Sequence, residues 1–301
     1  MRLLVTGANG QVGWELGRSL AALGNVAALD RRQCDLSRPE RLAGLIRGLK
    51  PDIIVNAAAY TAVDDAEREE ALATTVNGTA VGVMAEESRR AGALLVHYST
   101  DYVFDGRKDA PYTEDDPPHP LNAYGRSKLA GEIAVRDAAA AHLVLRTSWV
   151  YGPRGRNFLR TILRLARERD ELRIVADQTG APTSAAQIAQ ATAAIVATAV
   201  RERADGRFAP GLFHLTASGA TSWHGFAAAI LEGTTHEPMP AAGRVPRLLP
   251  IASEDYPLPA ARPKNSRLAG DRLRRRFGIA LPGWREGLSA CLEEMRTCEP
   301  A

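Results

Sequence analysis

Tyr124 and Lys128 stand four residues apart in the stretch AYGRSKLAGE (123–132), whose composition is typical of a helix. Side chains four apart lie on one face of a helix, so a phenol and an ammonium there can reach the same target. A tyrosine beside a lysine can act as an acid or base, because a nearby positive charge favours the phenolate. Ordinary helices also carry such pairs, so the pair alone does not establish catalysis.

A threonine ends the apolar run LLVHYST (94–100), which predicts a strand. Alternation along a strand places Tyr98 and Thr100 on one side and Ser99 on the other. We expect Thr100 at the carboxyl edge of a sheet, facing the helix that carries Tyr124. The tyrosine would then be an acid/base, its phenol acidified by Lys128 and by a positively charged nicotinamide. The threonine would bind a substrate oxygen, and Lys128 would hold the nicotinamide ribose.

Three glycines in VTGANGQVG, Gly7, Gly10 and Gly13, follow the first predicted strand and open the first predicted helix. Glycines at this place permit a tight turn, close approach of a pyrophosphate and close helix–strand packing. The helix N-terminus adds N–H donors and a positive dipole end for the anion. The spacing is G-x-x-G-x-x-G, and its position after strand one indicates a dinucleotide site.

Asp30 ends the second predicted strand, where an acidic residue meets the adenosine ribose in dinucleotide-binding folds. Arg31 and Arg32 follow, and a guanidinium can hold a 2′-phosphate. The sequence therefore leaves both NADH and NADPH open, and a solvated loop of mixed charge is the alternative. Asp35 and Leu36 lie further along, where an adenine-side contact is expected.

The elements that must position these residues alternate between strand-like and helix-like segments in the first half of the chain. The predicted strands are short apolar runs at residues 2–6, 26–30, 52–59, 94–100 and 142–150. Near-continuous apolar strands separated by helices predict an α/β fold, a Rossmann-type doubly wound parallel sheet covered on both faces. We expect an NAD(P)-binding domain at 1–150.

After residue 150 the loops lengthen and prolines cluster at 241–266, which is poor material for continuing such a sheet. We expect residues 151–301 to form mainly a smaller C-terminal substrate lobe over the carboxyl edge of the sheet. The segments 188–200 and 284–296 are expected to return to the first domain.

Composition excludes several classes of function. The chain has 301 residues, 45% hydrophobic and 24% charged, with a net charge of +3, which predicts no nucleic-acid or membrane partner. Its three cysteines show no metal-ligand spacing, and the N-terminus shows no signal peptide, so we expect a cytoplasmic protein. The basic cluster 272–276 is interpreted as a solvated face, with a polyanion site as the alternative.

Several stretches resemble the extended short-chain dehydrogenase/reductase family, and the resemblance covers nearly the whole chain. Its sugar-nucleotide-modifying members are matched by TGANGQVGWEL, NAAAYTAVDDAE, VHYSTDYVFDG and LNAYGRSKLAGE. The later stretches RTSWVYG, DQTGAPT and RPKNS are similar to members that reduce the C4 keto group of a dTDP-linked 6-deoxy sugar. The resemblance therefore implies an NADPH- or NADH-dependent oxidoreductase acting on a dTDP-sugar.

Carried over by position, the resemblance implies that Tyr124 is the proton donor, Lys128 its partner, and Thr100 with Asp101 the substrate-contacting pair. The implied cofactor-binding residues are Gly10, Gln11, Val12, Asp30, Asp35, Leu36, Ala58, Ala59 and Tyr60. Trp149 matches a substrate-contacting tryptophan, and an aromatic core residue is the alternative. Arg262 is expected to contact the anionic part of the substrate, with a surface role as the alternative.

Some members bind Mg²⁺ through a glutamate after the glycine motif and another after the later PT. This chain has Glu15, but PTSAAQIA (182–189) has no carboxylate, so we expect no strong metal site. A monomer and a homodimer both stay open. Two other functions also stay open: a sugar-nucleotide epimerase or dehydratase with the same Tyr and Lys, and a non-catalytic regulatory subunit of the same fold.

Overall fold

A parallel sheet forms the centre of the first lobe in the computed structural model, which describes residues 1–138, 141–234 and 245–298. Its strands are β1 (Arg2–Thr6), β2 (Asn25–Leu29), β3 (Ile53–Asn56), β4 (Leu94–Thr100), β5 (His142–Thr147) and β10 (Gly211–His214). They lie in the order β10-β5-β4-β3-β1-β2, and every pair is parallel. The predicted Rossmann-type parallel sheet is therefore confirmed.

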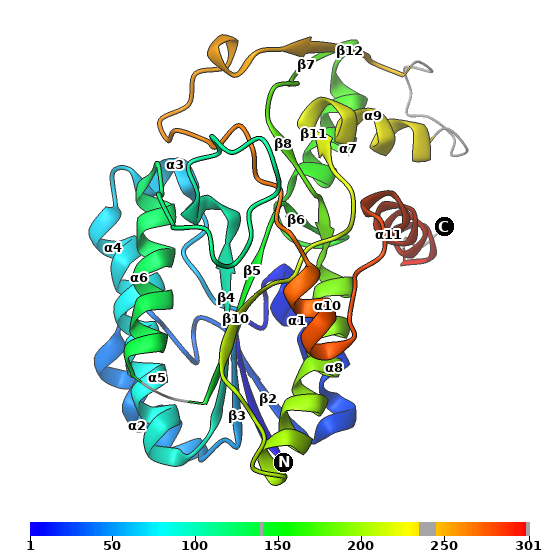
Figure 1. Cartoon of the computed structure of the whole chain (residues 1–301). Coiled ribbons are helices and arrows are strands. Elements are labelled where there is room, and N and C mark those ends of the chain that lie inside the picture. Colours follow the sequence, from blue (N-terminus) through cyan, green and yellow to red (C-terminus); the bar gives the residue numbers. More distant parts are fainter. Residues whose placement is uncertain (139–140, 235–244, 299–301) are drawn as a thin grey trace.

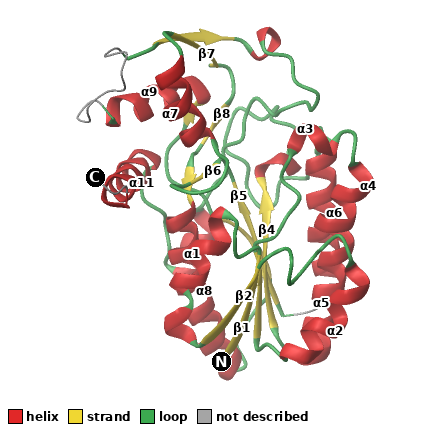
Figure 2. Cartoon of the chain, turned by 180° about the vertical axis from the view of Figure 1, so that it is seen from behind, coloured by secondary structure: helices red, strands yellow, loops and turns green. Residues whose placement is uncertain are grey.

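Helices cover both faces of this sheet, as Figure 1 and Figure 2 show. One face carries α1 (Gln11–Ser19) and α8 (Ala185–Ala204), and the other carries α2 (Pro39–Leu49), α5 (Ala80–Ala91) and α6 (Ala123–Asp137). Side chains such as Leu16 and Ile188 fill one core layer, and Ile46 and Met84 fill the other. Strands buried on both faces explain the continuous apolar runs in the sequence.

Short elements connect the end of β3 to α5. They are α3 (Val63–Ala66), α4 (Glu70–Thr74) and a π-helical turn at Thr75–Thr79. Short 3-10 turns lie at Ala21–Leu23, Asp101–Val103 and Ser253–Asp255. The turn at Asp101–Val103 follows β4 directly, so the chain changes direction immediately after Thr100.

A smaller lobe lies above the carboxyl edge of the sheet (Figure 1). Its strands form three two-stranded sheets, β6 (Val150–Tyr151) with β9 (Thr183–Ser184), β7 (Glu171–Val175) with β12 (Arg247–Ile251), and β8 (Thr179–Gly180) with β11 (Thr221–Ser222). Its helices are α7 (Phe158–Glu168), α9 (Trp223–Gly233) and α11 (Trp284–Cys298). Phe226, Leu159 and Leu288 belong to the hydrophobic cluster that holds this lobe together.

The chain crosses between the lobes more than once. Helix α8, strand β10 and helix α10 (Asp271–Phe277) all contribute side chains to the core of the first lobe, including Ile195, Phe213 and Leu273. Helix α11 instead packs mainly in the upper lobe, and Glu294 on it lies 3.8 Å from Arg18 of α1. These returning segments join residues far beyond residue 150 to the first sheet. The division of the chain at residue 150 stays a prediction.

Two stretches differ from the sequence-based expectation. Of the proline-rich stretch 241–266, residues 241–244 lie outside the described residues, and Arg247–Ile251 forms strand β12. The predicted strand 142–150 ends at Thr147, and the chain starts again as β6 at Val150. Trp149 interrupts it with a φ of +47°, which no strand residue adopts. No helix in the described parts of the chain has the length and hydrophobicity needed to span a bilayer.

Candidate active site

The glycine turn after β1 is shaped by steric limits at each glycine. Gly7 has a φ of +73°, and a Cβ there would lie 2.9 Å from the backbone nitrogen of Ala58. A Cβ on Gly13 would lie 2.0 Å from the carbonyl oxygen of Gly7. The N–H of Gly10 donates to that same oxygen over 2.8 Å, which closes the turn at the start of α1. This arrangement is the one that brings backbone N–H groups close to a pyrophosphate.

The two residues after Gly10 differ in what they contact. Gln11 Oε1 accepts a hydrogen bond of 2.8 Å from Asn157 Nδ2, the residue before α7, so the glycine turn is joined to the upper lobe. Val12 is partly buried and packs against the hydrophobic core under the sheet. Both residues lie in the first turn of α1, at the edge where the predicted cofactor site begins.

Asp30 follows β2 directly, and its carboxylate organises the turn that comes next. Oδ1 accepts from the N–H of Arg32 at 2.9 Å, and Oδ2 accepts from Asn9 Nδ2 at 3.2 Å. Arg31 is 81% exposed at its side chain and reaches Asp35 only at 3.7 Å. The strand end therefore presents one carboxylate and one exposed guanidinium, as the two cofactor alternatives require.

The remaining adenine-side residues are split between surface and core. A hydrogen bond from the Ser37 hydroxyl lowers the pKa of Asp35, which is partly exposed. Leu36 is buried in the hydrophobic cluster that includes Leu42 and Ile46 of α2. Its side chain is thus occupied by core packing, a placement that the sequence pattern alone did not reveal.

Ala58, Ala59 and Tyr60 follow β3 and are partly buried. The backbone of Tyr60 is held by Asn77, whose Oδ1 accepts from the Tyr60 N–H and whose Nδ2 donates to the Tyr60 carbonyl. Hydrogen bonding of the phenol to Glu69 raises the pKa of Tyr60 to about 12. The segment is therefore fixed from the π-helical turn that contains Asn77, and not by contacts of its own side chains alone.

Thr100 and Tyr124 meet at the carboxyl end of β4. Alternation along the strand does not explain this contact, because it predicts that Tyr98 and Thr100 share one side. Tyr98 points to the opposite helix layer, where its hydroxyl lies 2.6 Å from Thr192 Oγ1 of α8. The Thr100 hydroxyl donates to Asp101 Oδ1 over 3.0 Å and lies in hydrogen-bonding contact with the Tyr124 phenol. Thr100 and Asp101 are both buried, at 5% and 2% exposure.

Burial is the largest influence on the pKa of Tyr124. Removal from solvent raises the pKa of the phenol to about 12, and the contact with Thr100 offsets only part of that rise. The expected acidification of this phenol by Lys128 and a positively charged nicotinamide stays a prediction. A phenol that keeps its proton at neutral pH is nevertheless the form that a proton donor needs.

Lys128 is 3% exposed and donates from Nζ to the carbonyl oxygen of Tyr98 over 2.6 Å. Burial lowers the pKa of this lysine to about 8, although Glu132 on the same helix favours its charged form. Glycines let α6 approach this closely: a Cβ on Gly131 would lie 2.2 Å from the Asn77 carbonyl oxygen. The small residues beside Tyr124 and Lys128 thus have a structural reason.

Asn122 fixes the start of α6, two residues before Tyr124. Its Oδ1 accepts from the N–H of Gly125 at 2.8 Å, and its Nδ2 donates to the carbonyl of Ala261 at 2.7 Å. One side chain therefore caps the helix and binds a loop of the upper lobe. The ring of Tyr102 meets that of Tyr124 edge to face, with centroids 5.6 Å apart.

Arg262 lies in that same upper-lobe loop. It forms a bidentate ion pair with Asp64 of α3, with distances of 2.9 and 2.7 Å, and also donates to the carbonyl of Ala260. Its side chain is 17% exposed, so a purely surface role does not describe it. The pair joins the two lobes a short way from Tyr102, and a role in binding an anion stays a prediction.

Trp149 lies between β5 and β6 and stacks on Trp223 of α9, with ring centroids 3.6 Å apart and planes 7° apart. A Cβ on Gly180 would lie 2.5 Å from the Trp149 ring, so the glycine leaves room for the indole. The tryptophan is only partly buried. The geometry thus forms an aromatic platform in the upper lobe, and its contact with a substrate stays a prediction.

Within the described residues, no group of three or more His, Cys, Asp or Glu is arranged to hold a metal ion. Glu15 is buried next to Glu294, and burial with this second carboxylate raises the pKa of Glu15. Arg18 lies 3.7 Å from Glu15 and supplies a cation there. The expectation that no strong Mg²⁺ site is present stays a prediction.

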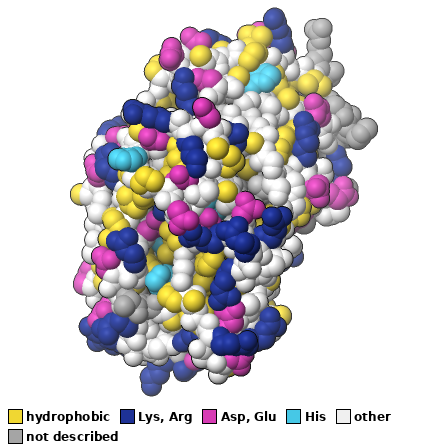
Figure 3. Space-filling view, in the orientation of Figure 1, with side chains coloured by type: hydrophobic (Ala, Val, Ile, Leu, Met, Phe, Trp, Pro, Cys, Tyr) yellow, Lys and Arg dark blue, Asp and Glu magenta, His cyan; other side chains and the backbone are white. Residues whose placement is uncertain are grey.

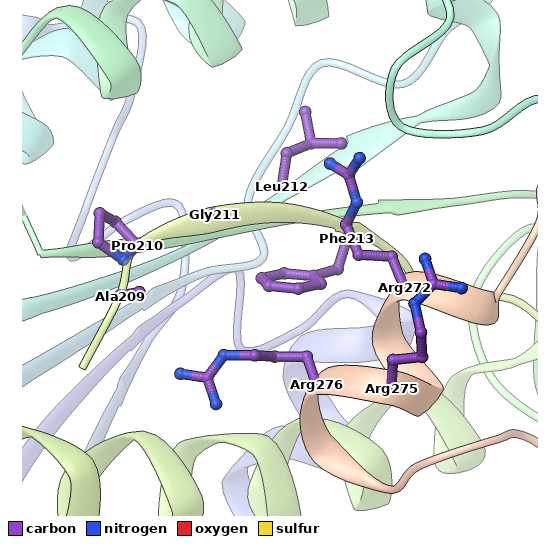
Figure 4. Close-up of a pocket in the computed structure, with 8 residues that line it drawn as sticks. All are labelled: Ala209, Pro210, Gly211, Leu212, Phe213, Arg272, Arg275 and Arg276. Carbon is purple, nitrogen blue, oxygen red and sulfur yellow. The ribbon is translucent and has the colours of Figure 1, made fainter. Parts of the chain in front are cut away.

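The basic cluster near the end of the chain lines a pocket of about 420 Å³ between β10 and α10, away from Tyr124 (Figure 4). Arg272 pairs with Asp115 at 2.5 Å, and Arg276 forms two contacts with Glu202. In Figure 3, acidic side chains lie among the basic ones over this part of the surface. Such pairing favours the interpretation as a solvated face over a polyanion site.

Sequence reasoning missed three polar residues that hold the site together: Asn77, Asn122 and His97. Each of them is buried, and His97 lies beside Lys128. Asn122 stands immediately before the predicted helix, so its type and place were a usable N-cap signal. Asn77 and His97 act through partners distant in sequence, which no local pattern identifies.

Comparison with known proteins agrees with this arrangement. The model of the family described as RmlD substrate binding domain matches residues 1–297. A dTDP-4-dehydrorhamnose reductase of Burkholderia thailandensis is 57% identical over 98% of this chain and 99% of its own length.

Two solved structures give the same result. A dTDP-4-dehydrorhamnose reductase of Clostridium acetobutylicum superposes with a TM-score of 0.88 at 34% identity, covering 98% of this chain and 100% of its own. One of Bacillus anthracis, in complex with NADP, gives 0.85 at 35% identity, covering 97% and 99%. The predicted family resemblance is thus confirmed over nearly the whole chain, which belongs to the RmlD substrate binding domain family.

Proposed function

We propose that this chain reduces the C4 keto group of dTDP-4-dehydro-L-rhamnose to give dTDP-L-rhamnose, with NADPH or NADH as the reductant. The observation that carries the proposal is the set of buried Thr100 and Lys128 with partly buried Tyr124 at the carboxyl edge of the sheet. The names of its relatives, and the NADP bound to one of them, support this choice of substrate and cofactor.

The residues present fit a nicotinamide dinucleotide. A Cβ on Gly7 would collide with the backbone of Ala58, and a Cβ on Gly13 with the carbonyl of Gly7, so the turn is tight where the N-terminus of α1 follows. Asp30 stands at the end of β2, where the adenosine ribose is expected. When bound, the reduced nicotinamide supplies the hydride for the ketone carbon.

The side chains of the chain itself supply the proton and the alignment. Tyr124 keeps its phenolic proton at neutral pH and would donate it to the oxygen that becomes the alcohol. The Thr100 hydroxyl would hydrogen-bond to that oxygen, which aligns the ketone and stabilises the negative charge that develops there. Lys128 would hold the nicotinamide ribose and keep positive charge beside the phenol.

The upper lobe would bind the rest of the substrate. The stacked pair of Trp149 and Trp223 presents an aromatic surface, and Asp101 lies beside Thr100 at the base of the site. Arg262 is the proposed contact for the pyrophosphate, a role that its ion pair with Asp64 would have to accommodate. A small-molecule sugar nucleotide is the partner, and a monomer and a homodimer both stay open.

The test is consumption of reduced nicotinamide by the purified chain, followed by absorbance, with enzymatically generated dTDP-4-dehydro-L-rhamnose and each cofactor in turn. One mole of cofactor should disappear per mole of ketosugar. Tyr124→Phe should cut turnover about 10²–10⁴-fold while cofactor binding stays nearly intact. Tyr256→Phe, at a tyrosine that is 54% exposed, is the matched control and should not change turnover.

The same assay separates the alternatives. An epimerase or dehydratase returns the hydride to the sugar, so it would keep a tightly bound oxidised cofactor and show no net consumption. A non-catalytic subunit would show no turnover alone. Near wild-type reduction by Tyr124→Phe would contradict the assignment of the proton donor.

A further inference from the structure

A line of buried hydrogen bonds runs from the cofactor side of the sheet to Lys128. The N–H of Ala58 donates to Thr6 Oγ1 over 3.3 Å, and the Thr6 hydroxyl donates to Asn56 Oδ1 over 2.6 Å. Asn56 Nδ2 lies 3.1 Å from His97 Nδ1. The line crosses from β1 through β3 to β4, and each of Thr6, Asn56 and His97 is at most 1% exposed.

The direction of these bonds sets the position of the proton on His97. Because Asn56 Oδ1 receives the Thr6 hydroxyl, it is the amide NH₂ of Asn56 that faces the ring. Nδ1 of His97 must then accept, so a neutral ring carries its proton on Nε2. Burial, with the charge of Lys128, lowers the pKa of His97 well below 6.5, and the ring stays neutral.

That Nε2 faces Lys128 at a distance of 3.5 Å. An N–H directed at an ammonium is unfavourable, whereas a neutral amine can accept from it. Gly131 of α6 leaves room for the ring, because a Cβ at this residue would lie only 3.2 Å from Nε2. The geometry therefore favours the neutral form of Lys128 more than a hydrogen-bond acceptor at the position of Nε2 would.

We propose that His97, held by Asn56 as the Nε2-protonated tautomer, is a positioning residue that makes Lys128 a weaker base. His97 itself gains and loses no proton in this role. The proposal rests on the proposed function only for its consequence in turnover, because the basicity of Lys128 is measurable without substrate.

Other charged and polar groups also lie around Lys128 and affect its basicity. From its own helix, Glu132 favours the ammonium, while Arg146 of β5 holds both oxygens of Glu132 at 2.7 and 2.6 Å and neutralises it. Tyr124 on α6 is protonated at neutral pH. Tyr98 of β4 offers its carbonyl oxygen. Among the groups of β3, β4, β5 and α6 named here, His97 is the one that directs an N–H at the amine.

The test is an NMR titration of Lys128 in the full chain, followed at Cε and Nζ after labelling of lysine. The chain has four lysines, so the Lys128 signal can be assigned by its loss in Lys128→Arg. His97→Gln places an amide oxygen where Nε2 stands, and the Lys128 midpoint should rise by about one pH unit. An unchanged midpoint in folded His97→Gln would overturn the proposal.

His214→Gln is the matched control, since His214 is also fully buried in a strand of the same sheet, but two strands away on β10. The Lys128 midpoint should not move in this variant. An equal rise in both variants would mean that loosening of the core, and not the His97 N–H, sets the basicity of Lys128, and this would also overturn the proposal.

Asn56→Leu is a second variant that keeps the imidazole and removes the group that fixes its tautomer. The ring ¹⁵N shifts of His97 should report protonated Nε2 in the wild type and a shift toward protonated Nδ1 in the variant. The Lys128 midpoint should then rise as in His97→Gln, because Nε2 becomes an acceptor. A wild-type ring protonated on Nδ1 would contradict the proposal even if His97→Gln did not fold.

The consequence for turnover is a shift in the pH profile. If reduction requires charged Lys128, the alkaline limb of kcat should move up by about one pH unit in His97→Gln and stay in place in His214→Gln. A shifted NMR midpoint without any ketosugar reduction would leave the role of His97 intact and contradict the proposed function instead.

Discussion

Burial shifts the pKa of three titratable side chains near the carboxyl end of β4. It raises the pKa of Tyr124 to about 12 and that of Asp101 to about 6, and it lowers that of Lys128 to about 8. In each case removal from water disfavours the charged form. Such shifts of several groups at one place are typical of functional sites, because catalytic groups need pKa values matched to their task.

At pH 8, charged Asp101 should lower the free energy of unfolding, although turnover should depend on this residue. Its native pKa of about 6 lies above the ordinary 3.8, so the folded chain binds the extra proton between these values and loses stability as pH rises through them. Asp101→Asn should therefore raise the free energy of unfolding by about 1–3 kcal/mol at pH 8 and leave it nearly unchanged below pH 4. Urea unfolding at both pH values measures this, and turnover should fall.

Asp105 provides the control with the opposite sign. The N–H of Arg107, with the Tyr112 hydroxyl, lowers the pKa of Asp105 below its usual value. Asp105→Asn should consequently lose stability at pH 8, where wild-type Asp105 is charged and hydrogen-bonded, with little change well below its native pKa. If both variants change stability in the same direction at pH 8, burial is not what perturbs Asp101.

Asp30 and Arg31 should decide between the two cofactors. Asp30→Ala should shift preference toward NADPH, because it removes a ribose acceptor and the repulsion of a 2′-phosphate. A charged hydrogen bond is worth about 1.5–3 kcal/mol, so kcat/KM for NADH should fall about ten- to a hundredfold. Replacing Arg31 and Arg32 by alanine should weaken NADPH chiefly. Equal cofactor ratios in all three proteins would show that neither charge meets the ribose.

At the scale of elements, the strands were predictable because a strand covered on both faces must be apolar throughout. All seven residues of β4 are buried, and its bounds match the predicted 94–100. Strand β10 was missed because its four residues, GLFH, are too short to show a period and lie among loop-forming residues. The site residues at strand ends followed from the strands, whereas His97 and Asn77 depend on partners distant in sequence, on β3 and α6 respectively.

A change at the N-cap of α6 should alter both the free energy of unfolding and turnover. Asn122→Ala removes both the cap to Gly125 and the bond to Ala261, 139 residues further along the chain. The unfolding free energy should fall by about 1–2 kcal/mol, and turnover should fall too, because Tyr124 stands two residues after the cap. Asn122→Asp keeps a capping oxygen but loses the donor to Ala261. It should therefore retain the helix but weaken the contact between lobes, and equal stability losses would contradict this division.

On the scale of the molecule, the loop at 258–262 joins the upper lobe to the first lobe near the start of α6 (Figure 1). Asp64 of the first lobe receives Arg262 in two bonds and the N–H of Ala260 in a third at 3.1 Å. Asn122 adds the bond to Ala261. Three neighbouring residues of one lobe are thus held by two side chains of the other, so the position of this loop depends on a small number of polar contacts.

Asp64→Asn should reveal what this fastening does for the substrate. The variant removes the charge that holds Arg262, whose guanidinium is mostly buried, and should loosen the loop while the glycine turn stays intact. The KM for the sugar nucleotide should rise about tenfold, a loss of about 1.4 kcal/mol, and the Kd for NADPH should change little. Asp65→Asn is the matched control, because Asp65 is half exposed and pairs with Arg68 near the same helix. If Arg262 binds the pyrophosphate independently of Asp64, Arg262→Leu will raise KM but Asp64→Asn will not, and the fastening would then have no part in substrate binding.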